Sequence, residues 1–501
     1  MPCLLPARHL VAKTTSFPTR RFLGHPVAQR FNSSASGSRS PSTPTQHALD
    51  LRTLDRLVTS ISRSSTQTVS PLTMRSLQSP WLSSQTPNLA SDAPFETERP
   101  VELTQAEQEA LLEPRHMSES FTTFELPLAS DPALLERYLN ASGGLRMGKL
   151  LEHLDSLAGA VSYLHCLPTL DVSSPNSAQA IHQASAKAGI YLATASADRL
   201  DLFARMNKDN IRDLRFSGFI TWTGNSSMEV IVKMEGTCPR EKDADGWETL
   251  MLGRFTMVCR DSRSQKARRI PALLVETDEE QALWKFGEEH RKRRSETKMM
   301  ALDKVPPSSE EAKELHDLML RVQDDKLVEI NGEQIVQMKD TESQNIQLMF
   351  PQDRNLHGKV FGGILMRLVS TAFELAFTNA ALFASKPMRF LSLDQITFRL
   401  PVPVGAVLRL TSKVVHTTRP EETPDGEAKA HIMVRAEVEE IDTGSRRETN
   451  TFFFTMAAED GQPIGRTVIP FSYGEAMHYL EGKRRVELGD EMRGLYRGGI
   501  Q

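Results

Sequence analysis

The chain has 501 residues, with 60 Lys and Arg against 64 Asp and Glu, a net charge of −4 and a mean hydropathy of −0.36. It contains no run of about 18 apolar residues, which excludes a transmembrane helix, and no long basic run, which argues against a nucleic-acid-binding body. The four cysteines are widely scattered (Cys3, Cys166, Cys238 and Cys259). This spacing excludes a zinc ribbon or a disulfide-rich secreted scaffold and suits a reducing compartment. The length predicts about two to four folded units.

The first 49 residues have the composition of a targeting leader. They contain six Lys and Arg, no acidic residue, and many Ser, Thr and Pro. An Arg-rich, Ser-rich and acid-poor N-terminus without the apolar run of a secretory signal is typical of a mitochondrial or plastid transit peptide. We expect residues 1–49 to be a mitochondrial transit peptide; the alternative is a plain disordered tail. Without these six positive charges, the net charge of −4 becomes −10 for residues 50–501.

Residues 50–113 are expected to be a disordered or linker segment, because most of them are Ser, Thr, Pro and Gln with few apolar neighbours. One part differs. Residues 50–64 carry apolar side chains at helical spacing and predict a short amphipathic helix, for import or for a later contact.

The rest of the chain contains an internal repeat. Asn140 is followed by glycines three and eight residues later and then by an apolar helical pattern, and Asn355 is followed by the same arrangement. Three matched positions along the two copies are offset by 215, 196 and 199 residues, a drift that loop insertions explain. Both copies close with a helix that ends in basic residues. The predicted domains are residues 114–300 and 341–490, joined by a linker over residues 301–340 with a helix at Ser309–Gln323.

Each copy reads as a strand, a glycine-rich turn, one long apolar helix and several further strands. The helices are expected at Leu150–Leu164 and Ile364–Leu382. A helix that is apolar nearly all round must be enclosed, and an antiparallel sheet wrapped around it achieves this. Pairing of two such units would cover the remaining sheet edges. The predicted fold class is therefore α+β, with two repeats that each wrap an antiparallel sheet around a long central helix.

These motifs resemble a known family. The turn Asn-x-x-Gly-x-x-Phe-Gly-Gly at Asn355–Gly363, the helix after it, and the strand Trp222–Val230 are similar to the hot-dog-fold acyl-coenzyme A thioesterases. The mitochondrial type with two hot-dog domains in one chain matches best, over about residues 115–490. The resemblance implies hydrolysis of acyl-CoA to a free fatty acid and CoA in the mitochondrial matrix. It also implies a homo-oligomer, and a reaction without cofactor or metal, because coenzyme A is part of the substrate.

Thioester hydrolysis needs a base or nucleophile and hydrogen-bond donors for the developing oxyanion. Backbone N–H groups of Gly362 and Gly363, at the positive start of a helix, are candidates for these donors. Glycine also leaves room for a thioester carbonyl to approach.

The resemblance assigns catalysis to an Asn in the turn of one repeat and an Asp on the helix of the other. The Asp position lies 15 residues after each Asn, which places Asp155 in the first repeat but Ser370 in the second. We therefore expect one working site, Asp155 with Asn355, and one degenerate site, Asn140 with Ser370. Glu374, one helical turn after Ser370, could partly replace the missing carboxylate.

Two questions stay open at this level. Asp155 could act as a general base on water or attack directly to form an anhydride, with Asn355 orienting the water or the carbonyl. The activity could also differ: Asp353, Asn355 and His357 superficially resemble the motif of a hot-dog enoyl-CoA hydratase, although the spacing to the histidine is one residue short and a proline is missing. A non-catalytic acyl-CoA-binding scaffold is the third alternative.

Overall fold

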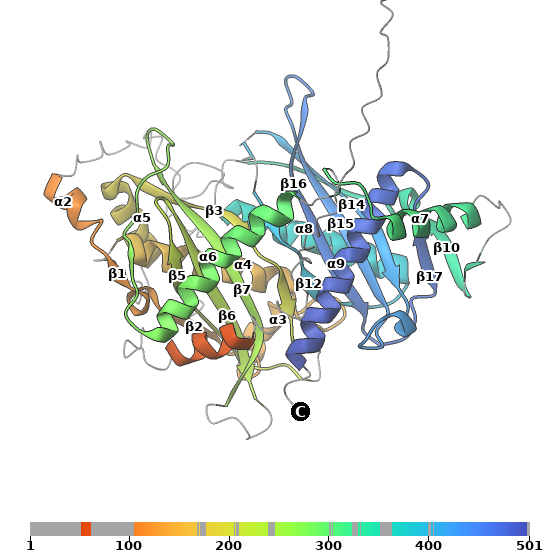
Figure 1. Cartoon of the computed structure of the whole chain (residues 1–501), viewed down its shortest axis with the longest axis horizontal. Helices are drawn as coiled ribbons and strands as arrows, with labels where there is room; N and C mark the ends of the chain where they lie inside the picture. Colours follow the sequence, from red (N-terminus) through yellow and green to blue (C-terminus); the bar gives the residue numbers. More distant parts are fainter. Residues whose placement is uncertain are drawn as a thin grey trace, which may run out of the picture. The chain divides into compact units, whose positions relative to one another are not determined.

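The computed structural model (Figure 1) describes residues 52–61, 105–167, 170, 177–204, 206, 210–238, 246–299, 302, 304–322, 329–330, 332–350, 363–398, 402–403 and 405–497. All of them belong to one compact unit, Pro44–Gln501. None of the described helices is both long and apolar enough to cross a membrane.

The first repeat has the predicted order of one strand, one long helix and a run of strands. Its elements are β2 (Thr122–Leu126), α4 (Met147–Cys166), β3 (Ile190–Ala197), β4 (Leu200–Leu202), β5 (Leu214–Thr223), β6 (Ser227–Thr237), β7 (Trp247–Asp261) and the closing helix α6 (Asp278–Met299). Short elements flank them: α2 (Gln105–Ala110), β1 (Arg115–His116), α3 (Pro132–Glu136), α5 (Ser177–Ala188) and β8 (Leu273–Leu274).

The second repeat follows the same plan. Its elements are β11 (Ser343–Leu348), α8 (Gly363–Ala384), β12 (Met388–Leu393), β13 (Ile396–Thr397), β14 (Val407–Thr418), β15 (Lys429–Glu439), β16 (Arg446–Ala458) and the closing helix α9 (Tyr473–Arg497). The chain between the repeats forms α7 (Ser309–Val322), β9 (Glu329–Ile330) and β10 (Glu333–Gln337), and β17 (Arg466–Ile469) precedes α9.

One twelve-stranded sheet joins the two repeats. Its main path runs β11-β14-β15-β16-β12-β4-β7-β6-β5-β2, and the junction is antiparallel, with β12 beside β4 and β13 beside β3. β3 is followed in the chain by β4, and β12 by β13, so each repeat contributes the same pair of strands to the junction. The two repeats therefore pair pseudo-symmetrically, as the sequence predicted.

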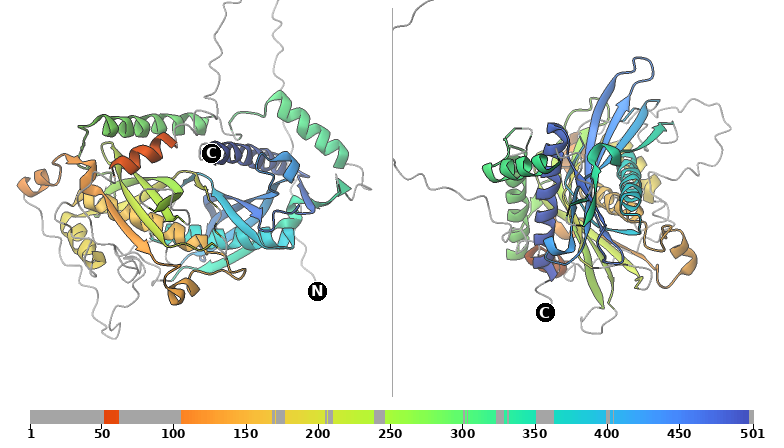
Figure 2. Two further views of the ribbon diagram at one scale, coloured as in Figure 1. Left: turned by 90° about the horizontal axis from the view of Figure 1, so that it is seen from below. Right: turned by 90° about the vertical axis from the view of Figure 1, so that its right-hand side faces the viewer.

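The helices divide between the two faces of this sheet. The two central helices α4 and α8 lie on one face, whereas α6, α9 and helix 52–61 lie on the other, which we call the outer face (Figure 2). Buried side chains of α4, α8 and the sheet form one continuous core, and α4 packs directly on α8. Enclosure between a sheet and a second helix explains why α4 and α8 are apolar on nearly every side.

The boundaries between the repeats differ from the prediction. Helix α7 agrees with the expected helix, but β10 pairs in parallel with β17, from Gln334 with Arg466 to Gln337 with Ile469. The second unit therefore starts before residue 341, and only part of the segment 301–340 is a linker. Polar strands this short lack the apolar alternation on which strand prediction depends. The predicted linker 50–113 likewise contains structure, because residues 52–61 form the expected amphipathic helix and pack on the first repeat.

Two of the scattered cysteines are neighbours in space. Cys166 at the end of α4 and Cys259 on β7 are both buried, and their free thiols hydrogen-bond to each other. The sequence spacing of 93 residues gave no sign of this contact, because it depends on α4 packing on the sheet.

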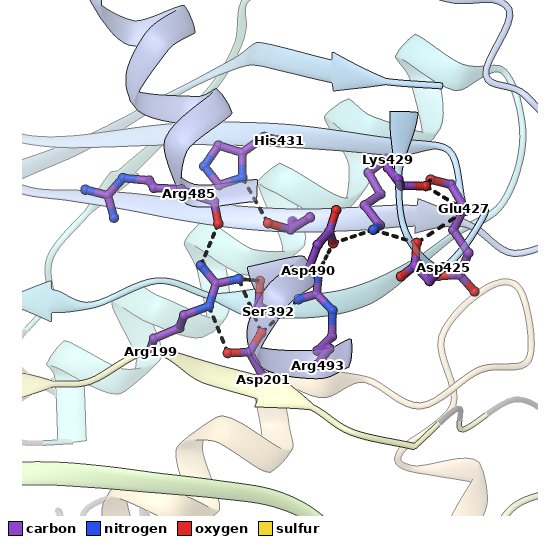
Figure 3. Close-up of polar contacts among 12 residues, drawn as sticks. Arg199, Asp201, Ser392, Asp425, Glu427, Lys429, His431, Arg485, Asp490 and Arg493 are labelled. Atoms are coloured by element: carbon purple, nitrogen blue, oxygen red, sulfur yellow. Dashed lines mark hydrogen bonds and ion pairs between the residues drawn. The ribbon is translucent and has the colours of Figure 1, made fainter. Parts of the chain in front are cut away.

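A buried network of charges connects α9 of the second repeat to the junction (Figure 3). Arg493, 1% exposed, donates to Oδ1 of Asp201 on β4 at 2.8 Å and to Oδ1 of Asp490 at 2.6 Å. Arg199 donates to Asp201 at 2.8 Å and also pairs with Asp394. Burial alone would lower the pKa of Arg199, but Asp201 and Asp394 outweigh it and hold this pKa above its ordinary value. Groups from both repeats thus neutralise one another at the joint.

The first repeat has a different polar contact at the corresponding place. His290 on α6 lies between two carboxylates, with Nε2 2.8 Å from Asp198 and Nδ1 3.0 Å from Glu229. Gly287 on α6 and Gly482 on α9 both approach the sheet closely and mark equivalent points of the two helices. Three residues after these glycines come His290 in the first repeat and Arg485 in the second, so the two side chains occupy equivalent places. Arg485 correspondingly faces Asp394 at 3.6 Å. The same position therefore carries a permanent cation in one repeat and a titratable one in the other.

We expect the docking of α6 to weaken as the pH rises above neutral. Burial and the nearby Arg254 lower the pKa of His290, but Asp198 and Glu229 raise it above its ordinary value overall. Its stabilising contribution is thus complete below the unfolded pKa of about 6.5 and is lost as the pH rises through the higher folded pKa. His290→Arg should retain this contribution, on the order of 1 kcal/mol, at pH 8 to 9. Urea unfolding of the wild type and of His290→Arg at pH 6 and pH 9 tests this. If both proteins lose the same free energy of unfolding between the two pH values, the prediction is contradicted.

Candidate active site

The turn before α4 is shaped by Asn140. Its carboxamide oxygen accepts hydrogen bonds from the backbone N–H of Ser142 at 2.9 Å and of Gly144 at 3.0 Å. Gly143 has a φ of 81°, which a residue with a side chain adopts only with strain. Asn140 therefore has a structural role in this turn.

The turn of the first repeat reaches the central helix of the second. A methyl group added to Gly148, near the start of α4, would lie 2.8 Å from Oγ of Ser370 and 3.3 Å from the ring of Phe373, both on α8. Ser370 is itself buried, at 7% exposed. The start of α4 in the first repeat and Ser370 on α8 of the second repeat are therefore close neighbours.

The turn of the second repeat lies mostly outside the described residues. Asn355 and Gly362 fall in the segment 351–362, and Gly363 is the first residue of α8. The pairing of Asn355 with Asp155 therefore stays a prediction.

Asp155 is a buried carboxyl group in the middle of α4. It is 5% exposed, and the hydroxyl of Thr194 on β3 donates to its Oδ1 at 2.8 Å. Burial raises the pKa of Asp155 to about 7, against the opposing effect of the Thr194 hydrogen bond. Asp155 also lies two helical turns after Gly148, so both are on one side of α4. A carboxyl group that titrates near neutral pH can accept and release a proton under physiological conditions.

Thr194 is a partner that the sequence did not reveal. A threonine in a strand is ordinary, and its contact with Asp155 arises because β3 packs across α4. The local signal was therefore too weak to identify it.

The second pseudo-site lacks both of these groups. Ser370 occupies the position of Asp155, and Phe390 occupies the position of Thr194. The second equivalence follows from the strands: Thr194 and Phe390 each directly precede the bulge of their strand and lie opposite Met257 and Met456, respectively. Phe390 and Phe373 pack edge to face, with ring centres 5.6 Å apart. Most of the described residues that line the small pocket here are apolar; the lining consists of Asn140, Gly144, Leu145, Met147, Leu202, Met206, Phe373, Phe377, Met388, Arg389, Phe390 and Glu459.

Glu374 does not take the place of the missing carboxylate. Its side chain is 52% exposed and forms an ion pair with Arg146, the residue before α4. The asymmetry between the two pseudo-sites therefore extends from the sequence to the side-chain environment.

The other polar residues near the motifs make local contacts. Nε2 of His153 lies 2.7 Å from the Tyr138 hydroxyl, and burial lowers the pKa of His153 to about 4. Lys483 and Arg484, from the basic stretch of α9, pair with Glu314 and Glu311 of α7. Among the described residues, no group of three or more His, Cys, Asp and Glu side chains is arranged to hold a metal ion.

Comparison with known proteins decides the family. The thioesterase superfamily profile matches residues 357–420. The mitochondrial acyl-coenzyme A thioesterase 9 of Mus musculus is 33% identical over 378 residues, which cover 75% of this chain and 79% of the relative. The chain belongs to the acyl-coenzyme A thioesterases. The mitochondrial acyl-coenzyme A thioesterase 4 of Humulus lupulus is 34% identical over 371 residues, or 73% of this chain and 66% of the relative.

Solved structures of such enzymes are also similar to parts of the chain. The acyl-CoA hydrolase of Staphylococcus aureus, solved with butyryl-CoA, is 22% identical and covers 33% of this chain and 96% of its own, with a TM-score of 0.29. The family membership, together with the two repeats joined in one sheet, shows that the fold is the hot-dog fold, present twice, and that the chain is an acyl-CoA thioesterase. The mitochondrial relatives support a mitochondrial location.

Proposed function

We propose that this thioesterase hydrolyses acyl-CoA to a free fatty acid and CoA at one site per chain, with Asp155 as the general base. The observation that carries this proposal is the buried carboxyl group of Asp155 on the central helix α4, which accepts a hydrogen bond from Thr194 on β3 and has a pKa of about 7. A base is most effective when its pKa lies near the working pH. Ser370 and Phe390 at the corresponding positions exclude the same chemistry from the second pseudo-site.

The proposed reaction begins when the Asp155 carboxylate removes a proton from water that Asn355 orients. The water oxygen attacks the thioester carbonyl, and the backbone N–H groups of Gly362 and Gly363 hold the oxyanion. Collapse of the tetrahedral intermediate breaks the C–S bond, and the proton on Asp155 passes to the CoA thiolate. Because Thr194 binds Oδ1, we assign the proton transfer to Oδ2.

Direct attack by Asp155 is the alternative route. It would form a mixed anhydride and release CoA before water enters. A single turnover in H₂¹⁸O, followed by mass spectrometry of the peptide that contains Asp155, tests the assignment. The general-base route places ¹⁸O in the fatty acid only, and ¹⁸O in Asp155 would contradict it.

Release of free thiol from acyl-CoA esters of varied chain length tests the activity itself. We expect turnover of at least one chain length by the purified protein. No thiol from any ester would overturn the proposal and leave the scaffold alternative, and hydration of enoyl-CoA instead would support the hydratase.

Activity and stability should respond to pH in opposite directions. Only the ionised Asp155 acts as a base, so kcat/KM should fall about tenfold per pH unit below pH 7. The folded pKa of about 7 exceeds the unfolded value of about 3.9, so the buried group stabilises the fold as the neutral acid. That contribution is complete below about pH 4 and is lost between about pH 4 and 7. Relative to Asp155→Asn, the wild type should therefore lose stability across this range in urea unfolding; parallel curves would contradict the shifted pKa.

We further propose a homo-oligomer in the mitochondrial matrix. The edge strand β11 leaves Ile346 55% exposed and Leu348 39% exposed, and Leu382 on α8 is 66% exposed. Apolar side chains on a sheet edge favour association with another copy. Light scattering of the wild type and of the Ile346→Lys, Leu348→Lys double variant tests the assembly, with a smaller mass expected for the variant. Protease protection in mitoplasts tests the matrix location.

The proposed reaction needs no cofactor or metal, because water and the side chains supply every proton transfer. Extensive dialysis against EDTA should leave kcat unchanged. A loss of activity that a metal restores would overturn this part.

A further inference from the structure

Helix 52–61 covers an apolar part of the outer face of the first repeat. Leu54 and Val58 are each 2% exposed and Ile61 is 6% exposed. They pack with a cluster contributed by the sheet, by α6 and by the segment before β2: Met117, Phe121, Phe203, Phe219, Ile231, Leu252 and Leu283. Burial of three branched apolar side chains is a large contribution for a helix of only ten residues.

The same helix supplies partners for a buried cation. Nζ of Lys233 on β6 lies 3.1 Å from Oδ1 of Asp55 and donates to the Thr59 hydroxyl at 2.8 Å. Thr249 on β7 also donates to Asp55, at 3.1 Å. The Lys233 side chain is only 5% exposed, and its other ion-pair partner among the described residues is Glu235, at 3.0 Å. Without the helix, the charge would lose two of these three contacts.

The second repeat shows what this face looks like without such a helix. The strand registers match Ile231 on β6 of the first repeat with Met433 on β15 of the second. Two residues further along, Arg435 therefore occupies the place that Lys233 has in the first repeat. Arg435 is 40% exposed and pairs with Glu448 at 3.7 Å. The first repeat has therefore adapted its outer face to helix 52–61, whereas the second keeps a solvated face.

We propose that helix 52–61 is a permanent part of the mature enzyme and that proteolytic removal of the leader ends before residue 52. A processing endopeptidase would hydrolyse one peptide bond there, with water providing the new carboxylate and amino terminus. A cut within or beyond the helix would expose the apolar cluster and remove Asp55 and Thr59 from Lys233. This inference rests on the transit peptide predicted for residues 1–49.

Import of the full chain into isolated mitochondria tests the position of the cut. Intact-mass analysis of the imported protein should give an N-terminus at or before residue 52. An imported, folded protein that begins after residue 52 would overturn the proposal, and so would a chain that is never cut.

Variants of the full chain test the docking independently. Leu54→Asp with Val58→Asp should lower Tm by roughly 5–10 °C, because both introduce a charge into the apolar cluster. Ser60→Asp, which adds one such negative charge on the exposed side of the helix, should change Tm by less than about 2 °C. Equal effects of the two changes would overturn the docking.

A double-mutant cycle isolates the Lys233 contact. Asp55→Ala should lower Tm in the wild type but much less in a Lys233→Met background, because no buried charge then needs a partner. The same loss in both backgrounds would contradict the contact. These readouts are independent of thioester hydrolysis: a protein that releases no thiol but shows them would refute the proposed function and retain the docked helix.

Discussion

Asp155→Asn should lower kcat for acyl-CoA hydrolysis by roughly 10²- to 10⁴-fold, the range that a general base contributes. The amide has the shape of the carboxyl group and can still accept the Thr194 hydrogen bond at Oδ1, but it cannot remove a proton from water. Because Asp155 is buried and near half protonated at pH 7, the neutral amide should not destabilise the fold. Thiol release at saturating acyl-CoA measures the effect, and thermal unfolding verifies that the variant is folded.

Ser370→Ala is the matched control in the second repeat. It occupies the equivalent helix position and is similarly buried, at 7% exposed, so a general effect of altering this core would appear in both variants. We expect its kcat to stay within about twofold of the wild type, since a site without a carboxylate has no base to lose. Full activity in Asp155→Asn, or an equal loss in Ser370→Ala, would show that the catalytic carboxylate is elsewhere.

Asp201→Ala should lower the free energy of unfolding by about 3–5 kcal/mol, the cost of breaking a buried ion pair. Asp201 is 2% exposed and accepts hydrogen bonds from both Arg199 and Arg493 (Figure 3). Its removal leaves two buried guanidinium groups with one carboxylate fewer, at the joint between β4 and α9. Urea unfolding followed by circular dichroism measures the loss.

Asp460→Ala provides the comparison at the surface. Asp460 pairs with Lys386 at 3.2 Å but is 50% exposed, and exposed pairs contribute about 0–1 kcal/mol. If the two variants lose the same stability, the network around Asp201 does not hold the repeats together.

The sequence predicted the fold because the determining signals are local and occur twice. Each central helix follows an Asn and glycine turn and is apolar on nearly every side, a pattern that identifies an enclosed helix without any knowledge of what encloses it. The sequence likewise predicted several further strands after each central helix. Their apolar alternation is long enough to exceed chance, whereas β10 and β17 are too short and polar to be recognised.

The candidate site was predictable only in part. The family resemblance indicated where on the helix a catalytic carboxylate is expected, and the repeat alignment then placed Asp155 at that position in the first repeat and Ser370 in the second. The raised pKa of Asp155 does not follow from the sequence, because it depends on desolvation by surrounding strands, and neither does its hydrogen bond to Thr194, 39 residues away in the chain.

By itself, the amino-acid sequence determined that this chain carries two copies of one unit, that only the first copy has an Asp at the helix position proposed for catalysis, and that a basic N-terminal segment precedes an acidic body. These properties depend on residue type and spacing, which a chain displays before it folds. Only the tertiary structure decided that Lys233 lies beneath helix 52–61, that His290 and Arg485 occupy equivalent places, and that Asp201 joins the two repeats. Such contacts join residues whose positions in the chain differ by between 61 and 292. Burial then sets the strength of each charge interaction. No local sequence pattern can contain this information.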